Sequence, residues 1–420
     1  MVQRPIAIDL FSGCGGMSLG LEAAGFDVVA SVEFDPVHML VHHFNFPYGI
    51  GLCQDIRTLN TQSLLEHIRR KGFAGEIDLV AGGPPCQGFS SMGKRQLDDP
   101  RNSLIFEYLR VIEEIQPKYF IFENVPGLNS GEHQSFLEKL LREIERINYT
   151  IAKPIQVLDS SEFGAPQKRK RLILIGTRKS LKKAKYPTLK RKGIQPPTVG
   201  DAISDLAGIN AFIKHDFGIP AGELDYSGFR EKFALTPAGD YALCYPRQTD
   251  GQVWGHIGSK HTEKSQQRFL AADGGKLEKV SHLFKLCDRG LCNTLRAGTA
   301  RDKGAYTAPR PIHYSQPRCI TVREAARLHT FPDWFQFHRT IWHGFREIGN
   351  AVVPLLAKAL GTEIIKCLKI DKNQLYPQHN IPLETRDRQY LKLNMHQACQ
   401  YWQIPYTVIP KRQRPRKPMA

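Results

Sequence analysis

Residues 6–24, IAIDLFSGCGGMSLGLEAA, contain the pattern that decides the fold of this 420-residue chain. Ile6–Phe11 is a short apolar run typical of a buried strand, and Met17–Ala24 has the composition of a helix that ends before Gly25. The glycines between them let the backbone approach a ligand, and the following helix begins with free N–H groups. The stretch predicts a strand, a ligand-binding turn and a helix, although a glycine cluster alone fits a structural turn equally well.

The alternation of strand and helix continues to about residue 178. Val28–Phe34 and Pro36–Phe44 form the next strand and helix. Further strand patterns occur at Ile77–Ala81, Tyr119–Glu123, Ile151–Leu158 and Leu172–Gly176. This alternation predicts an α/β fold with a doubly wound, mostly parallel sheet covered by helices on both faces. Ligands on such sheets bind at the carboxyl ends of the strands.

The periodicity fades from Lys179 to Arg318, where Gly, Pro, Lys and Arg are frequent, and we interpret that stretch as a loop-rich lobe inserted into the chain. Helical patterns return at Thr321–Thr330 and, after an expected turn at Gly349–Asn350, at Pro354–Leu368. We therefore predict four parts. They are a ligand-binding domain over residues 1–185, the lobe and a return hinge over 186–340, a helix completing the first domain over 341–370, and a basic surface extension over 371–420.

The charge of the chain predicts a polyanionic partner. The formal net charge is +17, and no acidic residue lies between Lys168 and Lys192. The tail from Lys411 to Lys417 is basic again. Nucleic acid is favoured over a membrane surface because no basic amphipathic helix is evident, and a merely solubilising surface is the alternative.

Composition also excludes several classes of protein. The nine cysteines form no close CxxC pairs, which argues against a disulfide framework and a zinc site, so we expect no metal. The longest apolar runs, such as Ile77–Gly83, are too short to span a membrane, and no signal peptide precedes the first strand. We expect a cytoplasmic protein that is not bound to a membrane.

The stretch GGPPCQGFS, residues 82–90, follows one of the buried strands. Two prolines fix the backbone just before Cys86, and glycine and serine follow. A rigidly presented thiol followed by a mobile loop suits a nucleophile that must meet a substrate and then be enclosed. The alternative is a buried structural cysteine, but the polar surroundings argue against it.

Two further motifs are expected at the same edge of the sheet. Glu123 ends the next strand, where its carboxylate could share a proton with a ring nitrogen of a ligand. In QKRKR, residues 167–171, strand alternation places Gln167, Arg169 and Arg171 on one face, and inward guanidinium groups suit a phosphate or a carbonyl oxygen. Taken singly, a salt-bridged glutamate and a solvated charge run are the alternatives.

The first turn favours a nucleoside ligand without phosphates. It reads GxGG and not the dinucleotide pattern GxGxxG, and no phosphate-binding lysine follows. Glu33 ends the second strand, a position suited to ribose hydroxyls, and Asp55 could accept from an adenine amino group. An NAD-dependent enzyme remains a rival that rests only on the glycine turn.

Six motifs now stand in order along the chain: DLFSGCGG (9–16), GGPPCQGFS (82–90), ENV (123–125), QKRKR (167–171), TVREAARL (321–328) and GNAVVP (349–354). Their order and separations resemble those of the DNA cytosine-5 methyltransferase family of the bacterial restriction-modification type. The resemblance spans residues 7 to about 360 but does not include the middle lobe or the tail.

The resemblance implies S-adenosylmethionine as methyl donor and a Rossmann-like methyltransferase fold. It implies that Cys86 attacks carbon 6 of cytosine, Glu123 contacts ring nitrogen 3, Arg171 holds the carbonyl oxygen and Arg169 supports the site, with no metal. The residues that it places in the donor pocket are Phe11, Ser12, Gly13, Cys14, Gly16, Glu33, Phe34, Asp55, Ile56, Pro85, Leu104, Asn350 and Val352.

Duplex DNA is the implied substrate, with the middle lobe as the target-recognition lobe. The cytosine must be flipped out of the helix, and Ser90, Lys94 and Arg101 would hold the backbone around it. Within the lobe, Thr294 and Arg296 are candidates for reading the major groove, and a lobe-packing turn is the alternative. An RNA (tRNA) cytosine-5 methyltransferase is the nearest rival, but the long middle lobe favours DNA. A catalytically silent DNA-binding relative is disfavoured by the intact motifs.

The compact chain leaves little room for regulatory domains. We therefore expect the modification half of a restriction-modification system, with a cognate restriction endonuclease encoded nearby. Such a protein would act as a monomer in a prokaryotic cytoplasm, on the DNA of the nucleoid.

Overall fold

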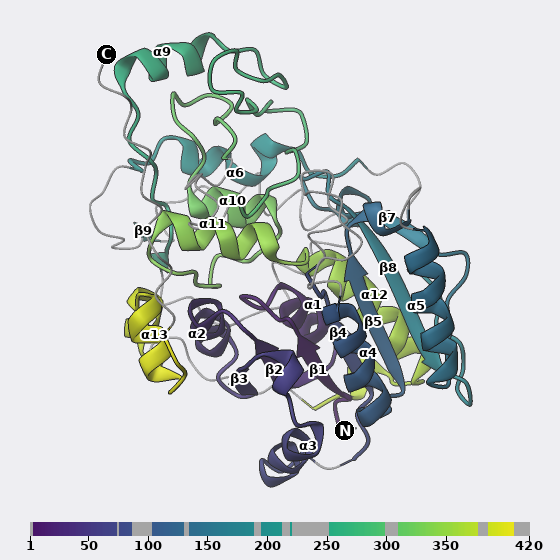
Figure 1. Cartoon of the computed structure of the whole chain (residues 1–420). Helices are drawn as coiled ribbons and strands as arrows, with labels where there is room; N and C mark the ends of the chain where they lie inside the picture. Colours follow the sequence, from purple (N-terminus) through teal and green to yellow (C-terminus); the bar gives the residue numbers. More distant parts are fainter. Residues whose placement is uncertain are drawn as a thin grey trace, which may run out of the picture.

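The computed structural model describes residues 3–73, 75–85, 103–129, 134–188, 195–211, 219–220, 252–298, 310–376 and 385–406. Its centre is an eight-stranded sheet with the order β3-β2-β1-β4-β5-β8-β6, in which β7 also pairs with β8 (Figure 1). The strands are β1 (Ile6–Leu10), β2 (Asp27–Glu33), β3 (Ile50–Cys53), β4 (Leu79–Gly82), β5 (Tyr119–Asn124), β6 (Tyr149–Ile151), β7 (Gln156–Asp159) and β8 (Lys170–Arg178). The first five pair in parallel, and β8 is antiparallel to β5, β6 and β7. The predicted doubly wound, mostly parallel sheet is confirmed.

One predicted strand was wrong. We expected a single strand over Ile151–Leu158, whereas the structure has two short strands, β6 and β7, which both pair with β8. Pro154 lies between them, and because proline has no N–H to donate, it interrupts the ladder there.

Helices cover both faces of the sheet. Their bounds are α1 (Gly16–Ala24), α2 (Pro36–Asn45), α3 (Thr61–Arg70), α4 (Ser103–Ile115), α5 (Gln134–Arg146) and α12 (Pro354–Cys367). Short 3-10 turns lie at η1 (Ile56–Thr58), η4 (Pro126–Asn129), η6 (Ser160–Phe163) and η9 (Lys372–Gln374). Alternate residues of β5 enter two cores: Ile121 packs on the side of α1 and α12, and Phe122 on the side of α4 and α5. Figure 1 shows these two helical layers with the sheet between them.

Helix α12 packs tightly on α1, although more than 300 residues of chain separate the two helices. A Cβ atom added to Gly20 would lie 2.4 Å from the Ala357 Cβ, and one added to Gly361 would lie 2.8 Å from the Ala24 Cβ. The last helix of the sheet domain therefore comes from the far end of the chain. The stretch Ile341–Cys367 is apolar enough to cross a membrane by composition, but 72% of its most apolar part is buried inside the protein.

A second lobe lies over the carboxyl edge of the sheet (Figure 1). Its described elements are α6 (Val199–Ala207), β9 (Ile219–Pro220), β10 (Gln252–Val253), α9 (Glu263–Ala271), α10 (Val322–Leu328) and α11 (Ile341–Asn350). The turn expected at Gly349–Asn350 was wrong, because both residues belong to the last turn of α11. The chain bends at residues 351–353 instead, and Pro354 begins α12 at the one helical position that needs no N–H donor.

The C-terminal extension is partly packed against the sheet domain. Its described elements, η11 (Arg388–Lys392) and α13 (Met395–Tyr401), lie on α2. Leu391 and Ala398 are fully buried, and the Trp402 indole N–H donates to the Pro36 carbonyl at 3.1 Å. We had expected only a surface extension, and the apolar residues spaced among its charges were the signal for this docking.

A buried ion pair joins α6 to α10, and it leads to a stability prediction. Arg327 is fully buried and donates to Asp205 at 2.6 Å and to Asp333 at 2.9 and 2.7 Å. Arg327→Met leaves two buried carboxylates without their cation, so we expect a loss of about 3–5 kcal/mol of unfolding free energy in urea titrations. The matched Lys276→Met breaks an exposed 3.0 Å pair with Asp273 and should cost below about 1 kcal/mol. Equal effects of the two variants would contradict this account.

Candidate functional site

The strand order predicts a ligand-binding crevice beside β1. From β1 the chain winds outward to β2 and β3 on one side and to β4 and β5 on the other. In doubly wound sheets, ligands bind at the carboxyl edge where the winding reverses, which here lies between β1 and β4. The glycine-rich turn, residues 11–15, follows β1, and the loop of residues 83–85 follows β4, so we name the position between them the crevice.

The glycine-rich turn presents unpaired groups to the crevice. Gly13 and Gly15 have φ angles of 54° and 105°, which glycine adopts without strain. Gly15 is the N-cap of α1 and supplies no side-chain cap. The Ser18 N–H is bound by Asp9, so the Gly16 and Met17 N–H groups are the ones available to a ligand. The Ser12 hydroxyl is buried and lacks a hydrogen-bond partner among the described atoms. The turn can therefore hold a polar group of a ligand.

Glu33 and Phe34 form the next part of the crevice, at the end of β2. The Glu33 carboxylate accepts from the Gly13 and Asp35 backbone N–H groups at 2.9 and 2.8 Å, and burial raises its pKa. A carboxylate has about four acceptor positions, so two remain for ligand hydroxyl groups. The Phe34 ring is 69% exposed, an unusual position for an aromatic side chain next to a buried strand.

Asp55, Ile56 and Leu104 lie farther along the same edge. Asp55 caps η1 through the Arg57 N–H at 3.0 Å and forms an ion pair with the Arg57 side chain at 2.5 Å. Ile56 is buried, whereas Leu104 in α4 is partly buried. The carboxylate of Asp55 thus has a protein partner, unlike the hydroxyl of Ser12.

Asp9, which sequence reasoning left without a role, fixes the start of α1 from inside the sheet. Its carboxylate accepts from the Ser18 N–H at 3.0 Å and from the Ser18 hydroxyl at 2.6 Å, and that hydroxyl also lies 3.0 Å from the His42 Nε2. Burial raises the pKa of Asp9 to about 7. The signal was available, because an aspartate inside an apolar strand demands a buried partner.

The raised pKa of Asp9 predicts a pH dependence of stability. The folded state binds the proton more tightly than the unfolded chain, so stability falls as pH rises from about 4 through the folded pKa of about 7. Asp9→Asn cannot titrate, and we expect its stability relative to wild type to improve with rising pH by up to ~1.4 kcal/mol per pH unit. Urea titrations across that range measure the difference, and a constant difference would contradict the prediction.

Residues 350–352 form the third wall of the crevice. A Cβ atom added to Gly16 would lie 2.3 Å from the Val352 carbonyl oxygen and 3.0 Å from the Ala351 Cβ. Val352 is buried and Asn350 exposed. Only glycine permits this contact, so the turn after β1 and the turn before α12 form one unit.

We expect Gly16→Ala to cost about 1–3 kcal/mol of unfolding free energy, because its methyl group must displace backbone. Displacement of the turn should also weaken binding of S-adenosylhomocysteine, used as a nucleoside probe in calorimetry, by roughly tenfold or more. Gly208→Ala is the matched control. Its φ is −78° and nothing lies within 4 Å of the added Cβ, so stability should be unchanged or slightly higher. Unaltered probe binding in Gly16→Ala would contradict the prediction.

Glu123 and Arg171 meet on the other side of the crevice. The Glu123 Oε1 lies 2.7 Å from the Arg171 Nε, and the two side chains are 12% and 15% exposed. The antiparallel register of β5 and β8 brings them together from opposite ends of their strands. The pair therefore presents a carboxylate and a guanidinium, side by side, to any ligand at this edge.

The loop that precedes Cys86 is fixed next to this pair. A Cβ atom added to Gly83 would lie 2.7 Å from the Glu123 Oε2, and the Asn124 amide donates to the Pro84 carbonyl at 3.2 Å. Pro85 is exposed. The predicted site residues Cys86, Ser90, Lys94 and Arg101 lie outside the described residues.

The residues before β8 alternate as predicted. Gln167 and Arg169 are buried, while Lys168 and Lys170 are exposed. The Arg169 guanidinium donates to three backbone carbonyls, those of Leu295 at 2.8 Å, Gly349 at 3.0 Å and Ala351 at 2.9 Å. Burial lowers its pKa well below the ordinary value. Arg169 therefore joins the sheet to the second lobe and to the crevice wall, away from direct contact with a ligand.

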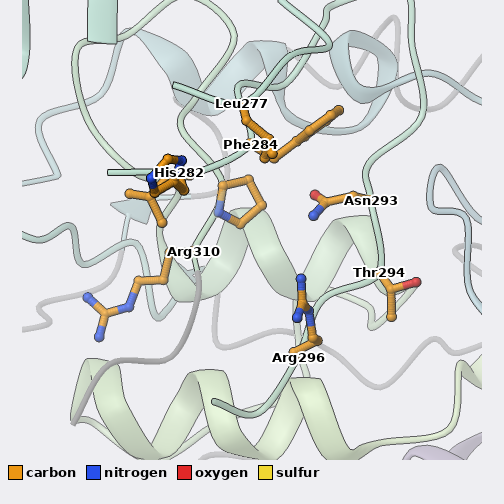
Figure 2. Close-up of a pocket in the computed structure, with 9 residues that line it drawn as sticks. Leu277, His282, Phe284, Asn293, Thr294, Arg296 and Arg310 are labelled. Carbon is orange, nitrogen blue, oxygen red and sulfur yellow. The ribbon is translucent and has the colours of Figure 1, made fainter. Parts of the chain in front are cut away.

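Thr294 and Arg296 line a pocket in the second lobe (Figure 2). The pocket has a volume of about 50 Å³, and Asn293, His282 and Arg310 also line it. The Thr294 hydroxyl donates to the Lys168 carbonyl at 2.7 Å, which places this segment beside β8. Sequence reasoning missed the other polar lining residues, because they come from separate loops with no common pattern.

The described part of the chain contains no group of three or more His, Cys, Asp or Glu side chains that could hold a metal ion.

Comparisons with known proteins agree with this arrangement. The family described as C-5 cytosine-specific DNA methylase matches residues 6–366. The Type II methyltransferase M.XorII of Xanthomonas oryzae pv. oryzae is 45% identical, over 99% of this chain and 96% of its own. The Type II methyltransferase M1.HphI of Haemophilus parahaemolyticus is 33% identical, over 86% of each chain. A crystal structure described as that of a "putative DNA modification methyltransferase" encoded within a prophage of E. coli is 33% identical, with a TM-score of 0.68 over 87% of this chain and 100% of its own.

Proposed function

Because this chain belongs to the C-5 cytosine-specific DNA methylase family, we propose that it methylates carbon 5 of a flipped-out cytosine within a specific duplex DNA sequence, through a transient bond to Cys86. As a member, it is a DNA cytosine-5 methyltransferase of the Type II restriction-modification class. The observation that carries the finer proposal is the Glu123–Arg171 pair, 2.7 Å apart, beside the loop that precedes Cys86 and next to the crevice at β1.

The crevice fits S-adenosylmethionine, which supplies an activated methyl group when bound. The unpartnered Ser12 hydroxyl and the N-terminus of α1 would hold polar groups of the donor, and Glu33 has acceptor positions left for ribose hydroxyls. The exposed Phe34 ring offers a face for the adenine. We infer that the donor pocket comprises the residues expected from the motifs: Phe11, Ser12, Gly13, Cys14, Gly16, Glu33, Phe34, Asp55, Ile56, Pro85, Leu104, Asn350 and Val352.

Carbon 5 of cytosine is a poor nucleophile, and the protein must activate it. In the proposed reaction the Cys86 thiolate adds to carbon 6, which places electron density on carbon 5. Glu123 shares a proton with ring nitrogen 3, and Arg171 donates to the carbonyl oxygen. Carbon 5 takes the methyl group as the sulfur–methyl bond of the donor breaks, and the donor leaves as its neutral thioether. Carbon 5 then loses its proton to solvent, and the sulfur–carbon 6 bond breaks to release the Cys86 thiolate and the methylated base.

Carbon 6 is inaccessible inside a duplex, so the cytosine must leave the helix before Cys86 can reach it. We propose that Ser90, Lys94 and Arg101, all in the sequence after Cys86, hold the DNA backbone around the extruded nucleotide. Thr294 and Arg296 would contact the duplex from the second lobe, where they share a pocket. Arg169 supports the site through the three carbonyls that it holds.

Methyl transfer onto nucleic acid tests the proposal. Tritiated S-adenosylmethionine should label duplex DNA and not tRNA, and bisulfite sequencing of DNA from a host that expresses the protein should show one modified sequence. Label on tRNA alone would assign the reaction to RNA, and absence of label on both would leave only DNA binding.

We also propose that the protein acts as a monomer on cellular DNA in the cytoplasm, where it protects the genome from a cognate endonuclease. A gene for an endonuclease beside this one, which cleaves unmodified DNA at the sequence found by bisulfite sequencing, is the expected observation. An endonuclease indifferent to the methylation would contradict the pairing.

A further inference from the structure

We propose that Gln167 and His329 are positioning residues that, together with Arg169, make donor binding and DNA binding depend on each other. This inference rests on the proposed function, because it concerns the same donor crevice and the same second lobe. The two residues would act through other groups, since both are fully buried. His329 reaches the crevice wall only through the Ala351 carbonyl, and Gln167 reaches it only through His329.

Two segments with different tasks meet where β8 begins. Residues 292–297 carry Thr294 and Arg296 and run beside the start of β8, with the Cys292 N–H donating to the Pro166 carbonyl at 2.9 Å. Residues 349–352 include the third wall of the donor crevice, which is formed by residues 350–352. The two segments touch, because a Cβ atom added to Gly349 would lie 2.3 Å from the Ala297 nitrogen. A displacement of either segment must therefore be accommodated by the other.

A directed chain of hydrogen bonds connects the segments. The Leu295 N–H donates to the Gln167 Oε1 at 3.1 Å, so the amide group of Gln167 has only one orientation available. Its Nε2 then faces the Leu328 carbonyl at 3.2 Å and the His329 Nδ1 at 3.0 Å. An amide nitrogen can only donate, so the His329 Nδ1 accepts and its Nε2 carries the proton, which it donates to the Ala351 carbonyl at 3.0 Å.

The protonation state of His329 agrees with this chain. Burial and the adjacent Arg169 lower its pKa well below the ordinary value, so the ring is neutral and has one donor and one acceptor nitrogen. A change at Leu295 would disturb Gln167, then His329, and then Ala351. The Cβ of Ala351 lies against Gly16, at the end of the glycine-rich turn.

Arg169 makes a second connection between the same segments. Its guanidinium donates to Leu295 on one segment and to Gly349 and Ala351 on the other. Separating the segments would leave buried N–H groups of a cation without acceptors, which is costly in a dry interior. Two residues farther on, Arg171 is held against Glu123, so the same strand positions the pair that faces the base.

The test measures binding and not turnover. Calorimetry measures the Kd of S-adenosylhomocysteine, which serves as the donor probe. The measurement is made with and without a DNA duplex that contains the sequence that the protein methylates. For the wild type we expect the duplex to tighten probe binding at least fivefold, within the range of typical coupling between sites. In Gln167→Leu and His329→Leu that ratio should fall by at least about twofold, since each change breaks the chain between Leu295 and Ala351 and leaves only the Arg169 connection.

A matched control separates coupling from general loss of stability. Tyr186→Phe also removes one buried hydrogen bond to β8, from the Tyr186 hydroxyl to the Ile173 carbonyl at 2.7 Å, but it touches neither segment. Its binding ratio should equal that of the wild type. If Gln167→Leu and His329→Leu both fold and keep the wild-type binding ratio, the proposal is wrong. Gln167 and His329 then have a structural role only.

Gln167→Glu keeps the proposal testable if the leucine variants do not fold. Glutamate retains the acceptor for Leu295 but sets a second oxygen against the His329 Nδ1, so a proton must bind between them to restore the chain. The charged groups that face this position are Arg169 and Arg171. We expect the binding ratio of this variant to recover as pH falls while the wild-type ratio stays flat, and a pH-independent ratio equal to wild type would refute the chain.

The outcomes also separate this inference from the proposed function. If the wild-type protein binds neither the probe nor the duplex, the proposed function itself is wrong. If the wild-type protein binds both, and the duplex leaves the Kd of the probe unchanged, only the proposed coupling is wrong.

Discussion

Replacement of Cys86 by serine is expected to lower the kcat of methyl transfer by at least about 10⁴-fold. A serine hydroxyl stays protonated near neutral pH, so it cannot add to carbon 6, and carbon 5 then stays unreactive toward the methyl group. Transfer of tritium from S-adenosylmethionine to duplex DNA measures the loss.

Trapping extends this test to the covalent step. A duplex with 5-fluorocytosine at the target has no proton to lose from carbon 5, so the wild-type protein should remain bound to it in an SDS-stable adduct. Cys86→Ser should form no adduct. Cys287 offers a matched control, because it is a free, exposed cysteine far from the donor crevice in sequence, and Cys287→Ser should retain both kcat and adduct formation. If Cys86→Ser still formed an adduct, a residue other than Cys86 would be the nucleophile.

The second large effect is expected at Glu123. Glu123→Gln should lower kcat by about 10²–10⁴-fold, the usual contribution of a group that shares a proton in the transition state. Glutamine keeps the shape of the side chain, but its amide cannot transfer a proton to nitrogen 3, and it replaces the charged 2.7 Å partner of Arg171 with a neutral one. KM for DNA should change less than kcat, because the contact strengthens as the ring gains electron density.

Single-turnover methylation on a duplex, with saturating donor, measures this step directly. Glu143→Gln is the control, since Glu143 forms an exposed pair with Arg146 on α5, and its kcat should match that of the wild type. A kcat for Glu123→Gln within about fivefold of wild type would exclude Glu123 from proton transfer.

The sequence predicted the strands that follow the repeating pattern of apolar run, loop and helix. Apolar runs followed by loops and helices were sufficient to place β1, β2, β4 and β5 and to identify the carboxyl edge, because burial on both faces forces that pattern. It failed for β6 and β7, where strands of three and four residues around Pro154 are too short for any periodicity to separate them.

The candidate site was predicted as a set of residues but not as a set of contacts. Glu123 and Arg171 were both singled out, yet their ion pair depends on the antiparallel direction of β8, which no local pattern encodes. His329 was not predicted at all, because a lone histidine at the end of an apolar helix is usually a core residue. Its role emerges only from Gln167 and Ala351, which are far from it in the sequence.

Because α12 packs on α1, the first helix of the sheet domain is synthesised long before the helix that covers it. The ribosome finishes the glycine turn early, but the wall formed by residues 350–352 and the helix that holds it in place come more than 300 residues later. A partly translated chain therefore has the glycine-rich turn but lacks the wall that packs on it. This edge of the sheet is complete only when α12 has folded back onto α1, so the N-terminal half of the chain alone cannot form it.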